Sequence, residues 1–404
     1  MTTIKYINII VLTFPVAHHI SGWRPVTRTH HLIVFLLTDS GFIGVGEGTP
    51  YGSSITETYA KALSLAKAIQ GLTLEDALNT LISKEYEEFE RSNQVNYGAY
   101  LTLESAVIHA LSQFRRARYE AEVLGGVYRT EIPVAYTIFL NHPKTMARKL
   151  ESAIKLGFKH VKFKIPCSLE ELEKQLQILY STRKQYDEEE VILRADANEC
   201  FSMLKKAEKA LSIMERHGVN IVEQPMPRHM LKDIAKLRKK FHSIIEIMLD
   251  ESLRKPSDIE IFAQLEVADA INFHPSKLGC LTITREAILK ARRLGMKANI
   301  GSALMTEIGL THYLNLAASI PHLDYPLEEM GLNNLYGYTL FPQAFPGIEK
   351  GVIPFHNISI RDLDFSMMEK FMINGRTLFS ERLKSIVAKA YILLKRTYRK
   401  PSGY

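Results

Sequence analysis

The pattern of hydrophobic and polar residues divides the chain into a first part of mixed period and a longer repetitive part. Residues 4–14 and 30–51 are rich in β-branched and aromatic side chains, and the turn sequence Asp39-Ser40-Gly41 interrupts the second segment. These features predict a strand and a hairpin. From about 55 to 120 apolar residues recur every three to four positions, and two glycines follow at 125 and 126. This spacing predicts helices that end at the glycines.

From residue 133 a short apolar run, a turn and an amphipathic helix repeat about every 25 to 30 residues, the size of a βα unit. Strands are expected at 133–138, 160–165, 191–198, 221–225, 244–252, 269–275, 297–303 and near 322–326. Eight such units predict an α/β barrel of the TIM type. An open doubly wound sheet is the alternative, but no glycine-rich dinucleotide motif follows any strand. We expect a barrel domain at 129–329, a capping domain at 1–128, and a tail at 330–404 that packs back on the cap.

Composition adds little to this picture. The 404 residues are 46% hydrophobic and 24% charged, as in ordinary globular proteins. The three cysteines, at 167, 200 and 280, lack metal-type spacing, which argues against a disulfide framework and for a reducing cytosol. The chain opens without signal-peptide features, and no segment reaches the length of a membrane span. We therefore expect a cytoplasmic protein without a membrane partner.

Lysine and arginine outnumber aspartate and glutamate by 51 to 44. Such an excess also occurs in nucleic-acid-binding proteins. Here the basic residues are scattered, and the densest group is the tail segment 395–400, which we interpret as a solvated end. A basic balance also suits an enzyme that acts on carboxylates. We expect a small-molecule carboxylate as the substrate and no nucleic-acid partner.

Charged residues stand at the predicted C-terminal ends of successive strands, where barrel enzymes have their active sites. Lys162 and Lys164 are two residues apart, so both face the same side of their strand. The next three strands end in Asp196, Glu223 and Asp250, and the two intervals between these acids are both 27 residues. Asn198 and Glu251 accompany the first and third of these acids. One acid on each of three adjacent strands predicts that their carboxylates converge above the barrel.

Three converging carboxylates would repel one another unless a cation lay between them. Oxygen ligands in that number suit Mg²⁺, and Mn²⁺ would also fit. Any single acid could equally be a helix cap or a surface residue, but all three in register favour a metal site. The two lysines could be a solvated strand end. Alternatively, their mutual repulsion and a nearby cation would lower a lysine pKa, so that Lys164 could take the α-proton of a metal-bound carboxylate.

The motifs KFK, RADAN, VEQP and LDES, in this order, resemble the enolase superfamily and, within it, the muconate cycloisomerase subgroup. The resemblance implies a modified (β/α)7β barrel with an α+β capping domain and a homo-oligomer. It also implies that Asp196, Glu223 and Asp250 bind Mg²⁺ and that Lys164 is the base on one face of the substrate. Lys162 would hydrogen-bond to the substrate carboxylate, and Glu251 after the third ligand fits this subgroup.

The predicted sixth strand departs from the family pattern. Alignment on Pro275 and Gly279 puts His274 where the family has its second catalytic lysine, and Lys277 where it has a further basic residue. His274 could transfer protons at neutral pH or only orient the substrate, and both interpretations stay open. Racemisation or epimerisation needs a proton carrier on each face, whereas cycloisomerisation or β-elimination can use Lys164 alone. We expect an isomerase, with a hydroxy-acid dehydratase or a binding barrel without turnover as alternatives.

Two positions bear on substrate specificity. Residues 13–31 occupy the place of the family's mobile capping loop, and Trp23 in this segment is a candidate contact for the far end of the substrate. On the last predicted strand, Asp324 is the only acid kept of the Asp-x-Asp that dipeptide epimerases share. This argues against a dipeptide substrate.

Overall fold

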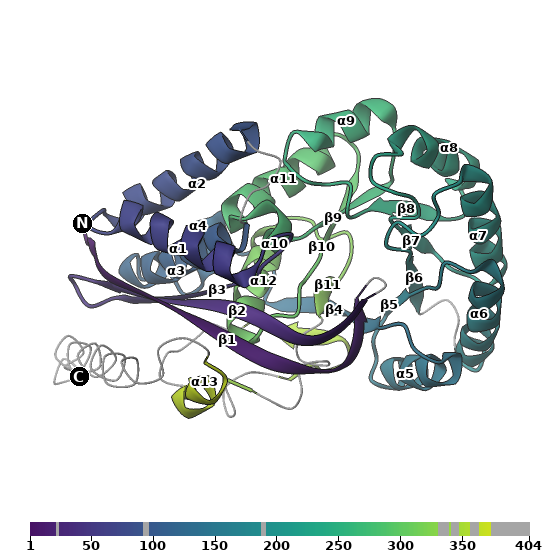
Figure 1. The fold of residues 1–404 in the computed structure, drawn as a ribbon, viewed down its shortest axis with the longest axis horizontal. Coiled ribbons are helices and arrows are strands. Elements are labelled where there is room, and N and C mark those ends of the chain that lie inside the picture. The colour runs from purple at the N-terminus through teal and green to yellow at the C-terminus, as the bar shows by residue number, and fades with distance from the viewer. Residues whose placement is uncertain are drawn as a thin grey trace.

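The computed structural model describes residues 1–21, 24–91, 97–186, 191–329, 339–340, 347–355 and 363–372. Its first part contains a three-stranded antiparallel sheet of β1 (Ile4–Ser21), β2 (Arg24–Thr38) and β3 (Ile43–Gly48), in that order. Helices α1 (Ile55–Ile69), α2 (Leu74–Arg91), α3 (Tyr97–Phe114) and α4 (Glu120–Leu124) follow (Figure 1). The last of these ends at Gly125, whose φ of 131° is a conformation that suits glycine.

The segment 13–31 corrects one expectation, because it is a β-ribbon rather than a loop. Pairing between β1 and β2 continues from Thr13 opposite His30 to Ser21 opposite Arg24, with one irregularity between Pro15 and His19. The ladder satisfies backbone groups that a loop would leave to water. In Figure 1 the ribbon extends from the helices of the first part to the barrel. Trp23, a predicted substrate contact, lies outside the described residues.

Three alternate glycines explain how helix α3 lies so close to strand β3. A Cβ atom at Gly44, Gly46 or Gly48 would overlap a backbone carbonyl oxygen of α3. Because successive residues of a strand face opposite sides, Glu47 points to the other face of the sheet. Strand β3 is thereby packed on α3 with one face and presents a buried carboxylate with the other.

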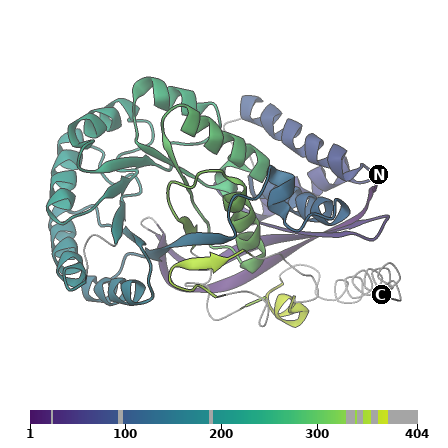
Figure 2. The ribbon, with the colours of Figure 1, turned by 180° about the vertical axis from the view of Figure 1, so that it is seen from behind.

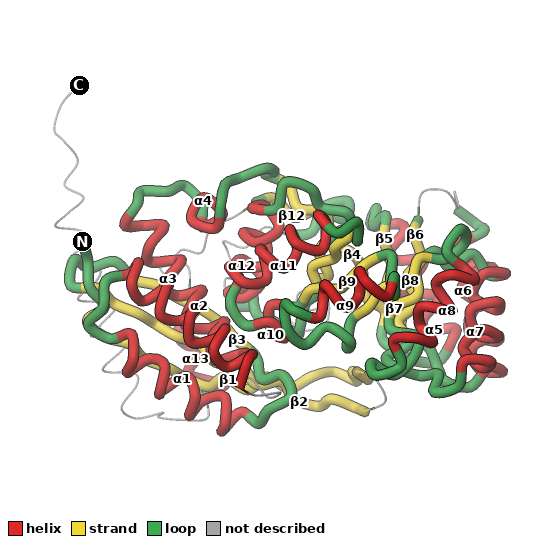
Figure 3. The backbone as a smooth tube through the Cα atoms, turned by 90° about the horizontal axis from the view of Figure 1, so that it is seen from above, coloured by secondary structure: helices red, strands yellow, loops and turns green. Residues whose placement is uncertain are grey.

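The second part is a ring of parallel strands surrounded by helices (Figure 1), and Figure 3 shows the same strands from another side. The strands are β4 (Glu131–Ile138), β5 (His160–Lys164), β6 (Ile192–Asp196), β7 (Ile221–Glu223), β8 (Glu246–Leu249), β9 (Ala270–Phe273), β10 (Lys297–Ile300) and β11 (Leu327–Glu329). The helices are α5 (Pro143–Lys155), α6 (Leu169–Arg183), α7 (Leu204–Arg216), α8 (Leu231–Phe241), α9 (Asp258–Leu265), α10 (Pro275–Leu278), α11 (Leu281–Arg293) and α12 (Glu307–Ser319). Pairing runs from β10 in descending order to β4 and then to β11, so the first barrel strand pairs with both the second and the last. The predicted barrel with a capping unit is confirmed.

The last barrel strand lies further along the chain than expected. It was predicted near 322–326, but β11 is Leu327–Glu329. Asp324 instead accepts a hydrogen bond from the backbone N–H of Ala298 and forms an ion pair with Arg292. These contacts hold the residues before β11 against β10 and α11, outside the interior of the barrel.

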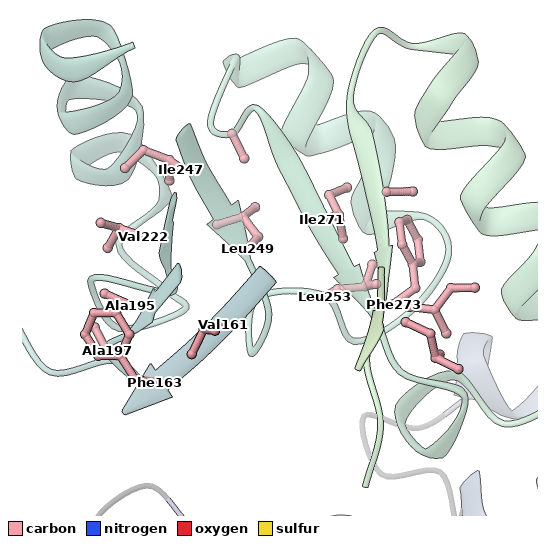
Figure 4. Close-up of a cluster of buried hydrophobic side chains, with 14 of the residues drawn as sticks. Val161, Phe163, Ala195, Ala197, Val222, Ile247, Leu249, Leu253, Ile271 and Phe273 are labelled. Atoms are coloured by element: carbon pink, nitrogen blue, oxygen red, sulfur yellow. The ribbon is translucent and has the colours of Figure 1, made fainter. Parts of the chain in front are cut away.

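Side chains alternate along the barrel strands between two environments. One set is apolar and belongs to the large hydrophobic cluster shared with the helices, as Figure 4 shows for Phe163, Ala195 and Val222. Their neighbours in sequence, such as Lys164 and Asp196, face the interior, where polar side chains of several strands contact one another. The period of two in the sequence therefore separates the structural core from the groups that can carry chemistry.

Buried acids connect the cap to the barrel. Glu47 of β3 accepts hydrogen bonds from the backbone N–H groups of Thr306 and Gly309, at the start of α12. Glu85 of α2 accepts from the N–H of Cys280, and Glu104 of α3 accepts from the N–H groups of Leu281 and Thr282, at the start of α11. The unpaired amides and the positive end of the dipole at a helix N-terminus both favour carboxylates.

Parts of the chain beyond the barrel return to both units (Figure 2). Strand β12 (Val352–Pro354) pairs antiparallel with β4. Helix α13 (Phe365–Phe371) lies near β1, and Met368 and Met372 pack in one hydrophobic cluster with Leu12. Among the described helices, none has the length and hydrophobicity needed to cross a membrane.

The cysteines correct a second expectation. Cys167 and Cys200 form a disulfide, with their Cα atoms 5.2 Å apart. They follow β5 and β6, which are neighbours in the sheet, so 33 residues of sequence separation become a short distance. Cys280 is buried and free. The argument for a reducing compartment from the cysteine spacing therefore no longer holds.

Candidate active site

A cavity of about 360 Å³ lies at the C-terminal ends of the barrel strands. Residues of β5, β6 and the loops after β8 and β9 line one side, including Lys162, Lys164, Asp196 and Asp250. Strand β2 and the residues after β3 line the other side, so the cap forms one wall of the cavity. This is the end of a TIM-type barrel at which catalytic groups gather.

Sheet register brings the predicted lysines and acids together. Lys164 pairs with Asp196, and Asp196 pairs with Glu223, so three charged residues stand in one row across β5, β6 and β7. Asp250 comes directly after β8, next to this row. Glu223 pairs with Met248, so Asp250 lies two residues further toward the C-terminal end of the barrel than this row.

Lys162 is enclosed by carboxylates. Its Nζ atom lies 2.8 Å from Glu223 Oε1, 3.0 Å from Asp196 Oδ2 and 3.2 Å from Glu328 Oε1. Burial opposes its charge, but the attraction of these carboxylates outweighs burial and raises the pKa of Lys162 well above its ordinary value. Lys162 is therefore a fixed cation, and its positive charge is available to neutralise or bind a carboxylate.

Lys164 has a different environment. Its Nζ atom donates to Asp196 Oδ2 at 2.6 Å and to Asn198 Oδ1 at 2.8 Å, and its side chain lines the cavity. Asn198 in turn donates from Nδ2 to Glu251 Oε1 at 2.9 Å. Burial, and then repulsion from Asp250, raise the pKa of Glu251 to about 7. Asn198 thus fixes the direction of the Lys164 ammonium group toward the acids.

The acids differ in their charge states. Burial is the largest influence on the Glu223 carboxyl and raises its pKa to about 8, and repulsion by Asp196 adds to the shift. For Asp196 burial acts in the same direction, but Lys162 and Lys164 outweigh it and lower its pKa. Two neighbouring acids that hold charge so unequally indicate an excess of carboxylates at this point.

Asp250 contacts His274 and Lys277, the two basic residues that follow β9. Its carboxylate forms an ion pair with Lys277, and His274 Nε2 lies 3.3 Å from Oδ1. Burial and then the charge of Lys277 lower the pKa of His274, which favours the neutral ring. The ring also packs against Gly301, and His274 Nε2 has no hydrogen-bond partner among the described residues. Lys277 lies under the ring of Tyr51, 5.3 Å from its centroid.

The acid set suits a divalent cation in chemical type. Within the described ranges, the buried Oε2 atom of Glu223 has no hydrogen-bond partner, although Arg194 Nε lies 3.3 Å away. A cation would satisfy this oxygen and relieve the repulsion that raises the Glu223 pKa. The described residues contain no group of three carboxylate, imidazole or thiol donors already gathered around one point. Lysine ammonium groups neutralise the carboxylates instead.

Known proteins match the chain along most of its length. Residues 145–356, more than half of the chain, match the family model Enolase C-terminal domain-like. The chain belongs to this family. The L-Ala-D/L-Glu epimerase of Clostridium acetobutylicum is 28% identical over 306 residues, 73% of this chain and 81% of that protein. Chloromuconate cycloisomerase of Cupriavidus necator is 24% identical over 341 residues, 81% of this chain and 88% of that protein.

The fold comparison agrees with the family. Muconate lactonizing enzyme of Pseudomonas fluorescens, in complex with muconolactone, superposes with a TM-score of 0.80 and 21% identity, covering 92% of this chain and 100% of that one. The resemblance predicted from the motifs KFK, RADAN, VEQP and LDES is therefore confirmed, and the protein is an enzyme of the enolase superfamily.

Several site residues of this enolase superfamily enzyme were not predicted. Glu328 of β11 is fully buried and contacts Lys162, Arg194 and the side-chain amides of Asn272 and Asn299. The acidic pair at 328 and 329, directly after an apolar residue, was the available signal. Arg28, His30 and Tyr51 of the cap also line the cavity. Asp324, the acid kept from the dipeptide epimerase motif, does not line it.

Proposed function

We propose that this enzyme moves the α-proton of a small carboxylate substrate, with Lys164 on one face and His274 on the other, and so acts as a racemase or epimerase. The observation that carries the proposal is the placement of these two residues on the barrel. Lys164 ends β5 and His274 follows β9, and these are the second and sixth of the described parallel strands. In a ring of eight, strands four apart stand on opposite sides. A substrate between them would present one face to each residue.

The charge state of the His274 ring suits proton transfer. A neutral His274 ring with an unpaired Nε2 can accept or return a proton. Lys277 is held by Asp250 and covered by Tyr51, so we assign it to substrate binding or to orientation of Asp250. Lys162 is the cation that would receive the substrate carboxylate.

Asp196, Glu223 and Asp250 would hold Mg²⁺, or Mn²⁺, which when bound supplies positive charge for the substrate carboxylate and for the charge that develops as the α-proton leaves. Lys162 stabilises the same negative charge from the protein side. The cap residues of β2 cover one side of the cavity, and reduced contact with water on that side would strengthen these interactions.

The relatives agree with an α-proton chemistry of this kind. An epimerase and a cycloisomerase both occur among them, and the former requires two faces. Cycloisomerisation is the second candidate, because it can proceed with Lys164 alone. The contact of His274 with Asp250 favours cycloisomerisation, since a histidine that only supports Asp250 would leave one face of the substrate without a proton carrier.

The test uses the purified full chain with Mg²⁺ in deuterium oxide and a panel of N-acyl amino acids, dipeptides and unsaturated dicarboxylates. Deuterium at the α-carbon is measured by mass spectrometry for each enantiomer. We expect Lys164→Ala to abolish exchange of one enantiomer and His274→Ala that of the other. Lys205→Ala, on the exposed face of α7, is the control. Racemisation that continues unchanged in His274→Ala would exclude the two-residue mechanism, and absence of exchange across the panel would reject the proposal.

A further inference from the structure

We propose that the Cys167–Cys200 disulfide braces the two loops that position Lys164, so that reduction of this disulfide by a dithiol slows α-proton transfer. The inference depends on the proposed function for its effect on turnover, but the brace itself is a feature of the fold. The disulfide is a covalent link beside the active site that neither the proposed metal ligands nor the proposed acid–base residues require.

The disulfide joins two loops at the mouth of the barrel. Cys167 lies three residues after Lys164, in the loop between β5 and α6. Cys200 lies two residues after Asn198, in the loop between β6 and α7. Both cysteines are half-buried rather than enclosed, and the experiments below therefore use a small dithiol as the reductant. A change in this bond therefore acts on the two segments that carry the Lys164–Asn198 hydrogen bond.

The loop after β6 has a backbone conformation that needs support. Asn198 and Glu199 have φ angles of 41° and 66°, in the left-handed region that non-glycine residues seldom adopt. Such conformations persist where the surroundings fix them. Asn198 must keep its place to accept from Lys164 and to donate to Glu251. Cys200 is the next residue but one, so the disulfide restrains this conformation directly.

On its other side the same loop is held without a covalent bond. The Glu199 carboxylate accepts hydrogen bonds from the backbone N–H, Nε and Nη2 of Arg228, and the Glu199 N–H donates to the carbonyl of Gln224. These contacts tie it to the loop after β7. Reduction would free only the side that faces Lys164, so we expect a local loosening and not unfolding.

The chemistry balances with a dithiol as the reductant. The bond between the two sulfur atoms breaks and each cysteine becomes a thiol, while the two thiols of the reductant form a disulfide and give up two electrons and two protons. Re-oxidation reverses this step. The third cysteine, Cys280, is buried behind Glu85 in the junction between cap and barrel and takes no part.

The first measurement needs no substrate. Backbone amide exchange of the full chain is followed by mass spectrometry before and after treatment with dithiothreitol. We expect faster exchange in residues 165–168 and 197–203 after reduction, and unchanged exchange at the start of α12. The double variant Cys167→Ser with Cys200→Ser should resemble the reduced protein in either condition. Cys280→Ala should respond as the unmodified chain does. Equal exchange in the oxidised and reduced chains would overturn the brace.

The second measurement follows α-deuterium incorporation in the same samples. We expect reduction to lower kcat by about tenfold with KM changed less than twofold, since a misplacement of about 1 Å can cost roughly 10²-fold. Re-oxidation should restore kcat in the unmodified chain and not in the double variant. A rate that reduction leaves unchanged, or a double variant that still responds to dithiothreitol, contradicts the inference. Absence of α-exchange in both states would instead reject the proposed function, while amide exchange still decides whether the brace exists.

Discussion

Buried acidic residues occur in two regions of this molecule, and their partners differ. At the junction between cap and barrel, Glu47, Glu85 and Glu104 accept hydrogen bonds from backbone N–H groups at the starts of α11 and α12. In the cavity, Asp196 and Glu223 are neutralised by lysine and arginine side chains. Backbone amides cannot move away without unfolding a helix, whereas side-chain cations can rotate.

This difference separates acids that hold the fold together from acids that remain available to a ligand. The junction acids accept hydrogen bonds from backbone N–H groups, and burial raises the pKa of Glu85 and Glu104. The cavity acids crowd one another, and Glu223 keeps an oxygen without a hydrogen bond among the residues described. An unpaired oxygen does not by itself separate the two regions, because Glu85 Oε1 at the junction also lacks a hydrogen-bond partner among the described residues. The separation lies in the type of partner, which is backbone N–H at the junction and side-chain cations in the cavity.

The largest effect is expected for Glu223→Gln. Glutamine keeps the shape of the side chain but cannot ionise, so it should weaken cation binding. We expect α-proton exchange to fall by at least about 10³-fold, close to 4 kcal/mol of transition-state stabilisation. The thermal midpoint should stay the same or rise, because a crowded carboxylate is lost. Exchange rates and thermal unfolding of the variant, with Glu90→Gln on exposed α2 as control, check both parts. A folded variant with normal exchange would remove Glu223 from the site.

The opposite result, a loss of stability with activity largely kept, is expected for Glu47→Ala at the junction. His31 Nδ1 and the N–H groups of Thr306 and Gly309 would lose their acceptor inside the protein. Removal of one member of a buried charged network typically costs about 3–5 kcal/mol. We expect that loss in the free energy of unfolding, measured by urea denaturation, while exchange below the unfolding temperature falls less than tenfold. Glu90→Ala should lie within about 0.5 kcal/mol of the unmodified protein. Loss of activity without loss of stability would show that the two groups of acids are not separate.

A pH dependence follows from Glu104. Burial is the main cause that raises its pKa from 4.5 to about 7, against the hydrogen bonds from Leu281 and Thr282. The folded state therefore binds this proton more tightly than the unfolded state. Its contribution to stability is complete below pH 4.5 and is lost as pH rises through 7, by up to about 3 kcal/mol. We expect Glu104→Gln to flatten the fall in unfolding free energy between pH 5 and 7. Parallel curves for variant and unmodified chain would contradict the assignment.

Much of the fold could be predicted because the periodic patterns in the sequence repeat along the chain. The period of two in the strands, the helical period between them and the interval of one βα unit agree with one another, so the barrel and its acid row could be predicted. Lys164, Asp196, Glu223 and Asp250 lie near one another because the first three end their strands and Asp250 directly follows β8. The extension of β1 and β2 was missed, since its polar, histidine-rich sequence resembles a loop and the pairing between the two strands is not visible in the sequence.

The contacts between distant segments could not be predicted in the same way. The Cys167–Cys200 disulfide depends on two loops whose separation in space is set by the sheet. Glu328 belongs to a strand of three residues, too short to show a period. Asp324 matched a family motif by position but is bound by Arg292. In each case the tertiary neighbours decide the role, and a single sequence does not contain them.

The smallest effect is expected for Arg28, which lines the cavity but was not among the residues predicted from the sequence. It lies on β2, in the wall that the cap contributes, and its side chain is exposed. We expect Arg28→Gln to raise KM about fivefold for substrates with a second anionic group far from the α-carbon, which corresponds to about 1 kcal/mol for an exposed ion pair, with kcat nearly unchanged. The effect should shrink at higher salt, because an exposed pair is screened. Comparison of KM at two salt concentrations, with Arg293→Gln on α11 as control, measures it. An equal rise for substrates that lack the distal anion would mean that Arg28 supports the shape of the β-ribbon instead of binding charge.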